Sequence, residues 1–240
     1  MKIDTNSNIY TFIYASVMVI IVAAALAFTA IKLQPLQEKN IRVEKMQNIL
    51  QSIGVPSTVE NAETLYNSHI TKQIVVNNKG EEIKGDAFKT NLPAQYKAKN
   101  DNKVLPVYYA KSDEGKEMII IPLTGKGLWG PIWGYVALEN DFNTISGVVF
   151  DHKGETPGLG AEINKTWFQE PFKGKTLFEG DKFVSITMYK GGKGSAKMAG
   201  DLKHGCDAIS GGTITSKGLE RMFKEEWLFN YEAFLKKNKK

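Results

Sequence analysis

An apolar run near the N-terminus constrains this chain most. No charged residue lies between Thr5 and Ile31, and the stretch from Ile9 to Ile31 has 23 residues, which span about 34 Å as an α-helix and can cross a bilayer. A cleaved signal peptide is the alternative, but its apolar core is usually about 7 to 15 residues long and follows a basic segment. This chain begins MKIDTNSN, so the sequence predicts a short tail at residues 1–8 and an uncleaved anchor at residues 9–31.

Charges around the anchor bear on its orientation. Four basic residues follow it, and before it stand only Lys2 and the amino terminus; the four are Lys32, Lys39, Arg42 and Lys45. An excess of positive charge marks the cytoplasmic side, although the rule loses weight ahead of a long folded domain. Charge alone therefore places the C-terminal side in the cytoplasm.

The composition excludes several classes of protein. With 240 residues, 24% charged and 42% hydrophobic, the chain is neither disordered nor collagenous nor a disulfide scaffold. The 31 basic and 26 acidic residues are scattered, so we expect no nucleic-acid partner. A single cysteine and three histidines exclude an internal disulfide and a cysteine-ligated iron–sulfur cluster and leave little for zinc. Redox chemistry would need a cofactor held in another way.

Hydrophobic spacing predicts one domain after a stalk. Met46, Ile49, Leu50 and Ile53 recur at helical spacing before Gly54, which indicates an amphipathic helix over about 36–53. We expect the stalk within 32–56 and one domain at 57–240.

Alternating apolar residues and turn signals predict strands at 70–78, 79–83, 104–110, 116–123, 132–139, 144–150 and 183–190. A final helix from about Thr215 to Lys237 has an apolar face of Leu219, Met222, Phe223, Trp227, Tyr231 and Phe234. The fold class is therefore α+β, with an N-terminal transmembrane helix, a stalk helix, a β-rich domain and a C-terminal helix.

The segment before the last helix is a candidate anion site. It reads DAISGGTIT over residues 207–215, and glycines beside a helix N-terminus let the free N–H groups approach a phosphate. The alternative is an ordinary cap, in which Thr213, Thr215 or Ser216 accepts a helix N–H bond.

Two other stretches carry weaker signals. The run KGGKGSAKMAG lacks the spacing of a nucleotide-binding loop, and its Lys190 and Lys193 either balance a phosphate or are solvated. His204 and Cys206 stand two residues apart without further ligands nearby, so we interpret both as structural and expect no metal site.

Three motifs together resemble a known family. Asp207-Ala208-Ile209-Ser210-Gly211-Gly212-Thr213 is similar to the Asp-x-x-Ser-Gly-Ala-Thr stretch that carries FMN in the C subunit of the bacterial sodium-translocating NADH:quinone reductase. This chain has Gly212 where the family usually has alanine. GETPGLG at residues 154–160 and GKGLWG at residues 125–130 resemble two further family segments in the same order. The resemblance extends over nearly the whole chain and is weakest at about 57–105.

The resemblance implies a cofactor, FMN, and a role for each motif residue. Thr213 would carry FMN through a phosphoester, with Thr215 as the alternative. Asp207 and Ser210 would shape and present the motif, and Gly211 and Gly212 would complete the cofactor-binding turn.

The other two motifs would supply the surroundings of the flavin. The resemblance implies cofactor contacts for Glu155, Thr156, Leu159 and Gly160, with the threonine offering a hydroxyl and the leucine an apolar surface. Trp129 either contacts the flavin at the side of its pocket or belongs to the hydrophobic core.

The function that the resemblance implies is electron transfer. The chain would be a subunit of a membrane enzyme, a sodium-translocating NADH:quinone oxidoreductase, and would relay electrons between an iron–sulfur centre and a second flavin. Its partners would be the other subunits, a flavin transferase and membrane lipid. The family places the flavin domain on the periplasmic side of the bacterial inner membrane, against the charge rule. The alternatives are the G subunit of the related Rnf ferredoxin:NAD complex, or a membrane-anchored accessory module without cofactor.

Overall fold

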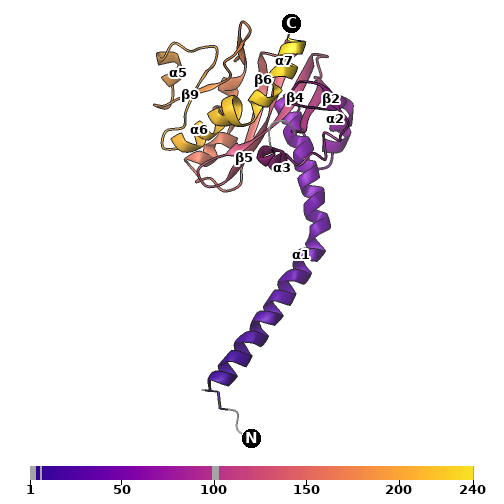
Figure 1. Cartoon of the computed structure of the whole chain (residues 1–240), viewed down its shortest axis with the longest axis vertical. Coiled ribbons are helices and arrows are strands. Elements are labelled where there is room, and N and C mark those ends of the chain that lie inside the picture. Colours follow the sequence, from indigo (N-terminus) through magenta and orange to yellow (C-terminus); the bar gives the residue numbers. More distant parts are fainter. Residues whose placement is uncertain (1–3, 6, 99–102, 240) are drawn as a thin grey trace. The chain divides into compact units, whose positions relative to one another are not determined.

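The computed structural model describes residues 4–5, 7–98 and 103–239. Its first helix, α1 (Asn8–Ser52), is one continuous helix that contains the predicted anchor and all but the last four residues of the stalk predicted at 32–56 (Figure 1). An 18-residue window within it has a mean hydropathy of 2.4 and is wholly unburied. By length and composition, α1 can cross a membrane.

The chain divides into two compact units, the first ending at Lys45 and the second beginning at Met46. The last turns of α1 belong to the second unit, where Met46, Ile49 and Leu50 are buried as the helical spacing predicts. The helix ends at Ser52, and Gly54, two residues later, has φ +78° and donates its N–H to the carbonyl of Gln51. A glycine in this left-handed conformation is a common helix stop.

A six-stranded antiparallel sheet forms the centre of the domain. The strand order is β2-β1-β3-β4-β5-β6. The strands are β1 (Ile70–Val76), β2 (Glu82–Ile83), β3 (Leu105–Lys111), β4 (Glu117–Lys126), β5 (Pro131–Glu139) and β6 (Ile145–His152). Each lies where the alternating pattern predicts a strand. Two short helices that the sequence analysis missed, α2 (Ala62–His69) and α3 (Leu92–Lys97), precede β1 and β3.

A region of short elements follows β6 and ends in a second, two-stranded parallel sheet. The elements are η2 (Gly160–Asn164), α4 (Thr166–Gln169), η3 (Glu170–Phe172), β7 (Phe178–Glu179), β8 (Lys182–Phe183), β9 (Thr187–Tyr189), α5 (Ser195–Met198) and β10 (Gly205–Asp207). The parallel pair is β9 with β10. The strand predicted at 183–190 is interrupted because Ser185 adopts a left-handed φ of 56°, which no strand accommodates.

The C-terminal segment changes helix type along its length. It runs through α6 (Thr213–Arg221), the π-helical turn η4 (Met222–Glu226), η5 (Leu228–Tyr231) and α7 (Glu232–Asn238). The prediction of one α-helix to Lys237 is therefore wrong in detail. The break falls at Trp227, whose φ of −135° and ψ of −66° are not helical.

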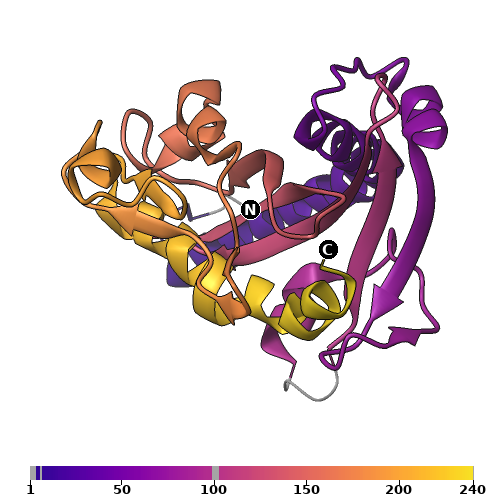
Figure 2. The ribbon, with the colours of Figure 1, turned by 90° about the horizontal axis from the view of Figure 1, so that it is seen from above.

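The six apolar residues predicted for this segment are all buried, despite the break. Trp227 donates its indole N–H to the carbonyl of Pro122 in β4 at 2.7 Å, and Tyr231 donates its hydroxyl to the carbonyl of Pro106 in β3 at 3.2 Å. These bonds tie the segment to the large sheet, and Figure 2 shows the yellow segment packed along it. The break at Trp227 therefore leaves both aromatic side chains buried against the strands.

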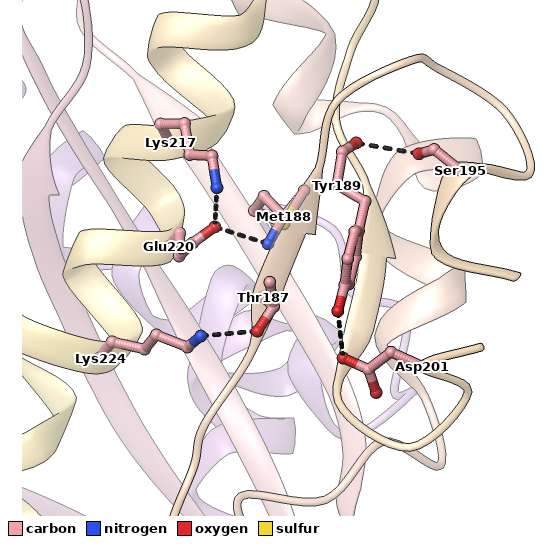
Figure 3. Close-up of polar contacts among 8 residues, drawn as sticks. All are labelled: Thr187, Met188, Tyr189, Ser195, Asp201, Lys217, Glu220 and Lys224. Carbon is pink, nitrogen blue, oxygen red and sulfur yellow. Dashed lines mark hydrogen bonds and ion pairs between the residues drawn. The ribbon is translucent and has the colours of Figure 1, made fainter. Parts of the chain in front are cut away.

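The other side of α6 holds the small sheet. Glu220 accepts the backbone N–H of Met188 at 2.7 Å and pairs with Lys217 at 2.6 Å, while Lys224 donates to the hydroxyl of Thr187 at 2.6 Å (Figure 3). Strand β9 is thereby fixed to α6 and its π-helical continuation. Since β10 pairs with β9 and leads into α6, the small sheet and α6 are connected both through the chain and through these contacts.

Candidate functional site

The GKGLWG stretch forms the turn between β4 and β5. Gly127 donates its N–H to the carbonyl of Gly130 at 2.8 Å, which closes the turn. Leu128 and Trp129 at its tip are 46% and 70% exposed. Trp129 therefore does not belong to the core, and that alternative is wrong. An exposed indole at a turn can contact a ligand or a partner.

The GETPGLG stretch is a tight loop between β6 and η2. The N–H groups of Leu159 and Ala161 both donate to the carbonyl of Thr156 at 3.1 Å. Gly158 has φ +75°, a conformation that favours glycine. The loop leaves the side chains of Thr156 and Leu159 exposed, as a cofactor contact would require.

The third motif, residues 207–213, forms a turn that Ser216 of α6 holds in place through hydrogen bonds. Ser216 is fully buried; its hydroxyl accepts the N–H of Ile209 and donates to the carbonyl of Gly212, each at 3.0 Å. Gly211 completes the turn with φ +77°. The cap residue of α6 is Gly212, so among the described residues no side chain caps the helix. The first N–H groups of α6 therefore remain available to an anion.

A buried carboxylate joins the three motifs. Glu155 is 5% exposed. One of its oxygens accepts the hydroxyl of Thr215 at 2.5 Å, and the other accepts the backbone N–H of Trp129 at 2.9 Å. Thr215 is 1% exposed, so its hydroxyl is both occupied and inaccessible to a bulky group. This geometry favours Thr213, which is half-buried, over Thr215 as an attachment point.

A pocket of about 270 Å³ opens where these motifs meet. It is lined by Leu128, Glu155, Thr156, Leu159, Gly160, Gly211, Gly212, Thr213, Ile214 and Thr215. Seven of the ten predicted cofactor-binding residues thus share one cavity. The seven are Glu155, Thr156, Leu159, Gly160, Gly211, Gly212 and Thr213.

Asp207, Ser210 and the side chain of Trp129 lie outside this lining. The carboxylate of Asp207 accepts the N–H groups of Gly194 at 2.5 Å and Ala196 at 2.8 Å, and the hydroxyl of Ser195 at 3.1 Å. Burial would raise the pKa of Asp207, but these hydrogen bonds and the nearby Lys175 hold it below its ordinary value. Asp207 therefore organises the glycine-rich loop before α5.

The motif turn separates the first pocket from a second one of about 530 Å³. The second is lined by Trp167, Phe168, Pro171, Gly192, Lys193, Cys206, Asp207, Ala208, Ile209 and Ser210. Lys190 and Lys193 are both exposed. Ser210 thus faces away from the pocket that holds Thr213.

His204 and Cys206 have structural surroundings. His204 contacts the carbonyl of Thr176 through Nδ1 at 2.7 Å, and burial raises the pKa of the Cys206 thiol to about 12. Within the described residues, no group of three or more potential metal ligands occurs.

The sequence analysis missed several residues of the site. Leu128 and Ile214 line the pocket with exposed apolar side chains. The sequence predicts Ser216 only as a helix cap, whereas its hydroxyl bonds Ile209 and Gly212 of the motif turn. The run Thr213-Ile214-Thr215-Ser216 gave a signal, because three hydroxyls at a helix start are unusual. Nothing local indicates that Thr215 meets Glu155, which lies 60 residues away.

Comparisons with known proteins agree with this geometry. Residues 127–226 match the model of the FMN-binding domain, a span that contains the whole pocket lining. The C subunit of the Na(+)-translocating NADH-quinone reductase of Neisseria meningitidis serogroup A is 33% identical over 240 residues, covering 92% of this chain and 90% of that protein. The chain belongs to the family of this reductase subunit.

Other members of the family agree over a similar length. The corresponding subunit of Haemophilus ducreyi is 30% identical and covers 93% of this chain and 91% of its own. The crystal structure of the subunit from Parabacteroides distasonis superposes with a TM-score of 0.74 at 41% identity, covering 85% of this chain and 96% of that one. Shewanella oneidensis NqrC gives a TM-score of 0.68 at 29% identity, with coverage of 82% and 97%. The fold described above is thus the fold of the family.

Proposed function

We propose that this chain is the flavin-carrying subunit of a membrane sodium-translocating NADH:quinone oxidoreductase, with FMN joined by a phosphoester to Thr213. One observation carries the proposal. The half-buried hydroxyl of Thr213 lies at the uncapped N-terminus of α6, in a pocket built by three family motifs. Neither the hydroxyl nor the helix end is used by other described side chains.

The residues of the pocket fit FMN in their chemistry. A phosphate on Thr213 would meet the free N–H groups and the positive end of the dipole of α6. Gly211 and Gly212 line the same pocket and bring only backbone close to it. Leu128, Leu159 and Ile214 present exposed apolar surface that suits an aromatic ring.

When bound, FMN would supply the electron-carrying chemistry, and the chain would supply position and environment. A covalent link suits a carrier on an exposed domain, because the carrier cannot diffuse away. We propose that electrons pass from an iron–sulfur centre to this flavin and on to a second flavin, the partners being other subunits of the reductase. The names of the relatives favour this complex over the Rnf complex.

The mass of the purified protein tests the proposal. Co-expression with a flavin transferase should add the mass of FMN minus water, and peptide mapping should locate it on the peptide that contains Thr213. The protein should be yellow. An unmodified, colourless protein made beside a transferase that is active on another substrate would support the accessory module instead.

We further propose that α1 anchors the chain in the inner membrane, with the flavin domain on the periplasmic side. An 18-residue window of α1 with a mean hydropathy of 2.4 supports the anchor. The four basic residues after it oppose this orientation, but they precede a domain of about 200 residues, for which the charge rule is weak. Alkaline phosphatase fused to the C-terminus should be active, and a cytoplasmic reporter at the same site inactive. The reverse pattern would contradict the orientation.

A further inference from the structure

Glu155 is an unusual residue to find beneath an apolar pocket. It is 5% exposed, and among the described residues no lysine, arginine or histidine forms an ion pair with it. Within the described part of the chain, its two oxygens accept only neutral donors, the Thr215 hydroxyl and the Trp129 N–H. Burying a carboxylate without a counterion costs folding free energy. If only packing mattered, a neutral side chain at this position would make the domain more stable.

Two glycines allow backbone to pack directly on this carboxylate. A Cβ atom on Gly127 would lie 2.5 Å from Oε1 of Glu155, and one on Gly160 would lie 2.5 Å from Oε2. The carboxylate is therefore enclosed by the β4–β5 turn, its own loop and the first turn of α6. Since these three segments line the pocket, one side chain sets their mutual positions.

The carboxylate also lies in the same pocket as Thr213. Glu162 offers a comparison within the same sequence stretch: it accepts the N–H of Gly158 at 3.1 Å but is only half-buried and does not line the pocket. An electron that enters the pocket from a reductant adds one negative charge beside Glu155 unless a proton accompanies it. Like charges repel more strongly where water is excluded.

We infer that Glu155 is a positioning residue whose buried charge also lowers the reduction potential of the flavin. This inference rests on the proposed attachment of FMN at Thr213. One role is geometric, because the carboxylate accepts the backbone N–H of Trp129 and so holds the β4–β5 turn, whose Leu128 lines the pocket. The other role is electrostatic, because reduction of a group beside a fixed negative charge is disfavoured.

A redox titration of the full chain in detergent tests the electrostatic role. Each electron passes from dithionite to the flavin, and the absorbance reports the oxidised fraction. Glu155→Gln keeps the size and one acceptor but removes the charge. We expect it to favour one-electron reduction about tenfold, a shift of about 59 mV to more positive potential. Glu162→Gln, the matched control, should titrate like the wild type. Equal potentials for Glu155→Gln and the wild type would overturn the electrostatic role.

A variant that keeps the charge separates the two roles. Thr215→Val removes one hydrogen bond to Glu155 and leaves the carboxylate in place. We expect no positive shift of the potential in this variant. A positive shift as large as that of Glu155→Gln would mean that the geometry, and not the charge, sets the potential.

Hydrogen exchange tests the positioning role without flavin. In the unloaded full chain, the amide of Trp129 should exchange slowly in the wild type and faster in Glu155→Ala, which leaves it without an acceptor. Glu155→Gln should restore part of the protection. Unchanged exchange in Glu155→Ala would overturn the positioning role. A wild-type protein without covalent FMN would instead count against the proposed function, and its mass would reveal this before any titration.

Discussion

Thr213→Ala should abolish the covalent flavin and leave the fold intact. The hydroxyl is the atom that would form the ester, and the described residues give it no hydrogen-bond partner that folding would lose. The cap of α6 is Gly212, and Ser216 holds the turn, so the helix start does not depend on Thr213. We expect the free energy of unfolding to change by less than about 0.5 kcal/mol.

Two measurements on the same preparation test this prediction. Intact mass shows whether covalent FMN is lost, and urea denaturation gives the change in the free energy of unfolding. Thr156→Ala is a matched control, because Thr156 is an exposed threonine that lines the same pocket. It should keep the covalent FMN. Retention of the added mass in Thr213→Ala, with the modified peptide elsewhere, would show that another hydroxyl carries the flavin.

Gly160→Ala should damage the pocket although it adds only one methyl group. The added Cβ would collide with Oγ1 of Thr215 and lie 2.5 Å from Oε2 of Glu155. Both atoms belong to the hydrogen bond between the two side chains, so the added methyl group would disturb that bond. Forced contacts in a packed interior usually cost about 1–3 kcal/mol, and we expect most of the covalent FMN to be lost as well.

The same loop provides the control for this variant. Gly154 has no heavy atom within 4 Å of an added Cβ and no left-handed φ, so Gly154→Ala should retain both stability and flavin. Urea denaturation and the fraction of protein with added mass measure the two effects. Equal behaviour of the two variants would contradict the close packing of Gly160 on Glu155.

The sequence predicts the large sheet well because its strands are regular. Each hairpin combines an alternating or continuous apolar run with a turn, and these local signals suffice to locate the strands. The C-terminal segment shows the limit of such signals. Its apolar spacing correctly selects the buried residues, but the π-helical turn is followed by Trp227, whose indole bonds the carbonyl of Pro122, 105 residues away, and no local pattern encodes that contact.

The candidate site likewise has a part that the sequence predicts and a part that it does not. Glycines, hydroxyls and the three motifs identify most of the pocket from sequence. The partner of Asp207 is not predictable from its motif, because its carboxylate binds amides of a loop 11 to 13 residues earlier. The link between Glu155 and Thr215 is equally hidden, since it joins segments that only the folded sheet brings together.

The two hydrogen bonds by which Ser216 holds the motif turn have a consequence for whether the domain folds before or after the flavin is attached. Isolated from the domain, the seven residues of the motif would have neither this serine nor the amides of α6, and their threonine would be one hydroxyl among many. In the folded domain the same threonine is held at a helix end beside a pocket. If Thr213 carries the flavin, we expect the acceptor to be created by folding, so that attachment follows folding of the domain.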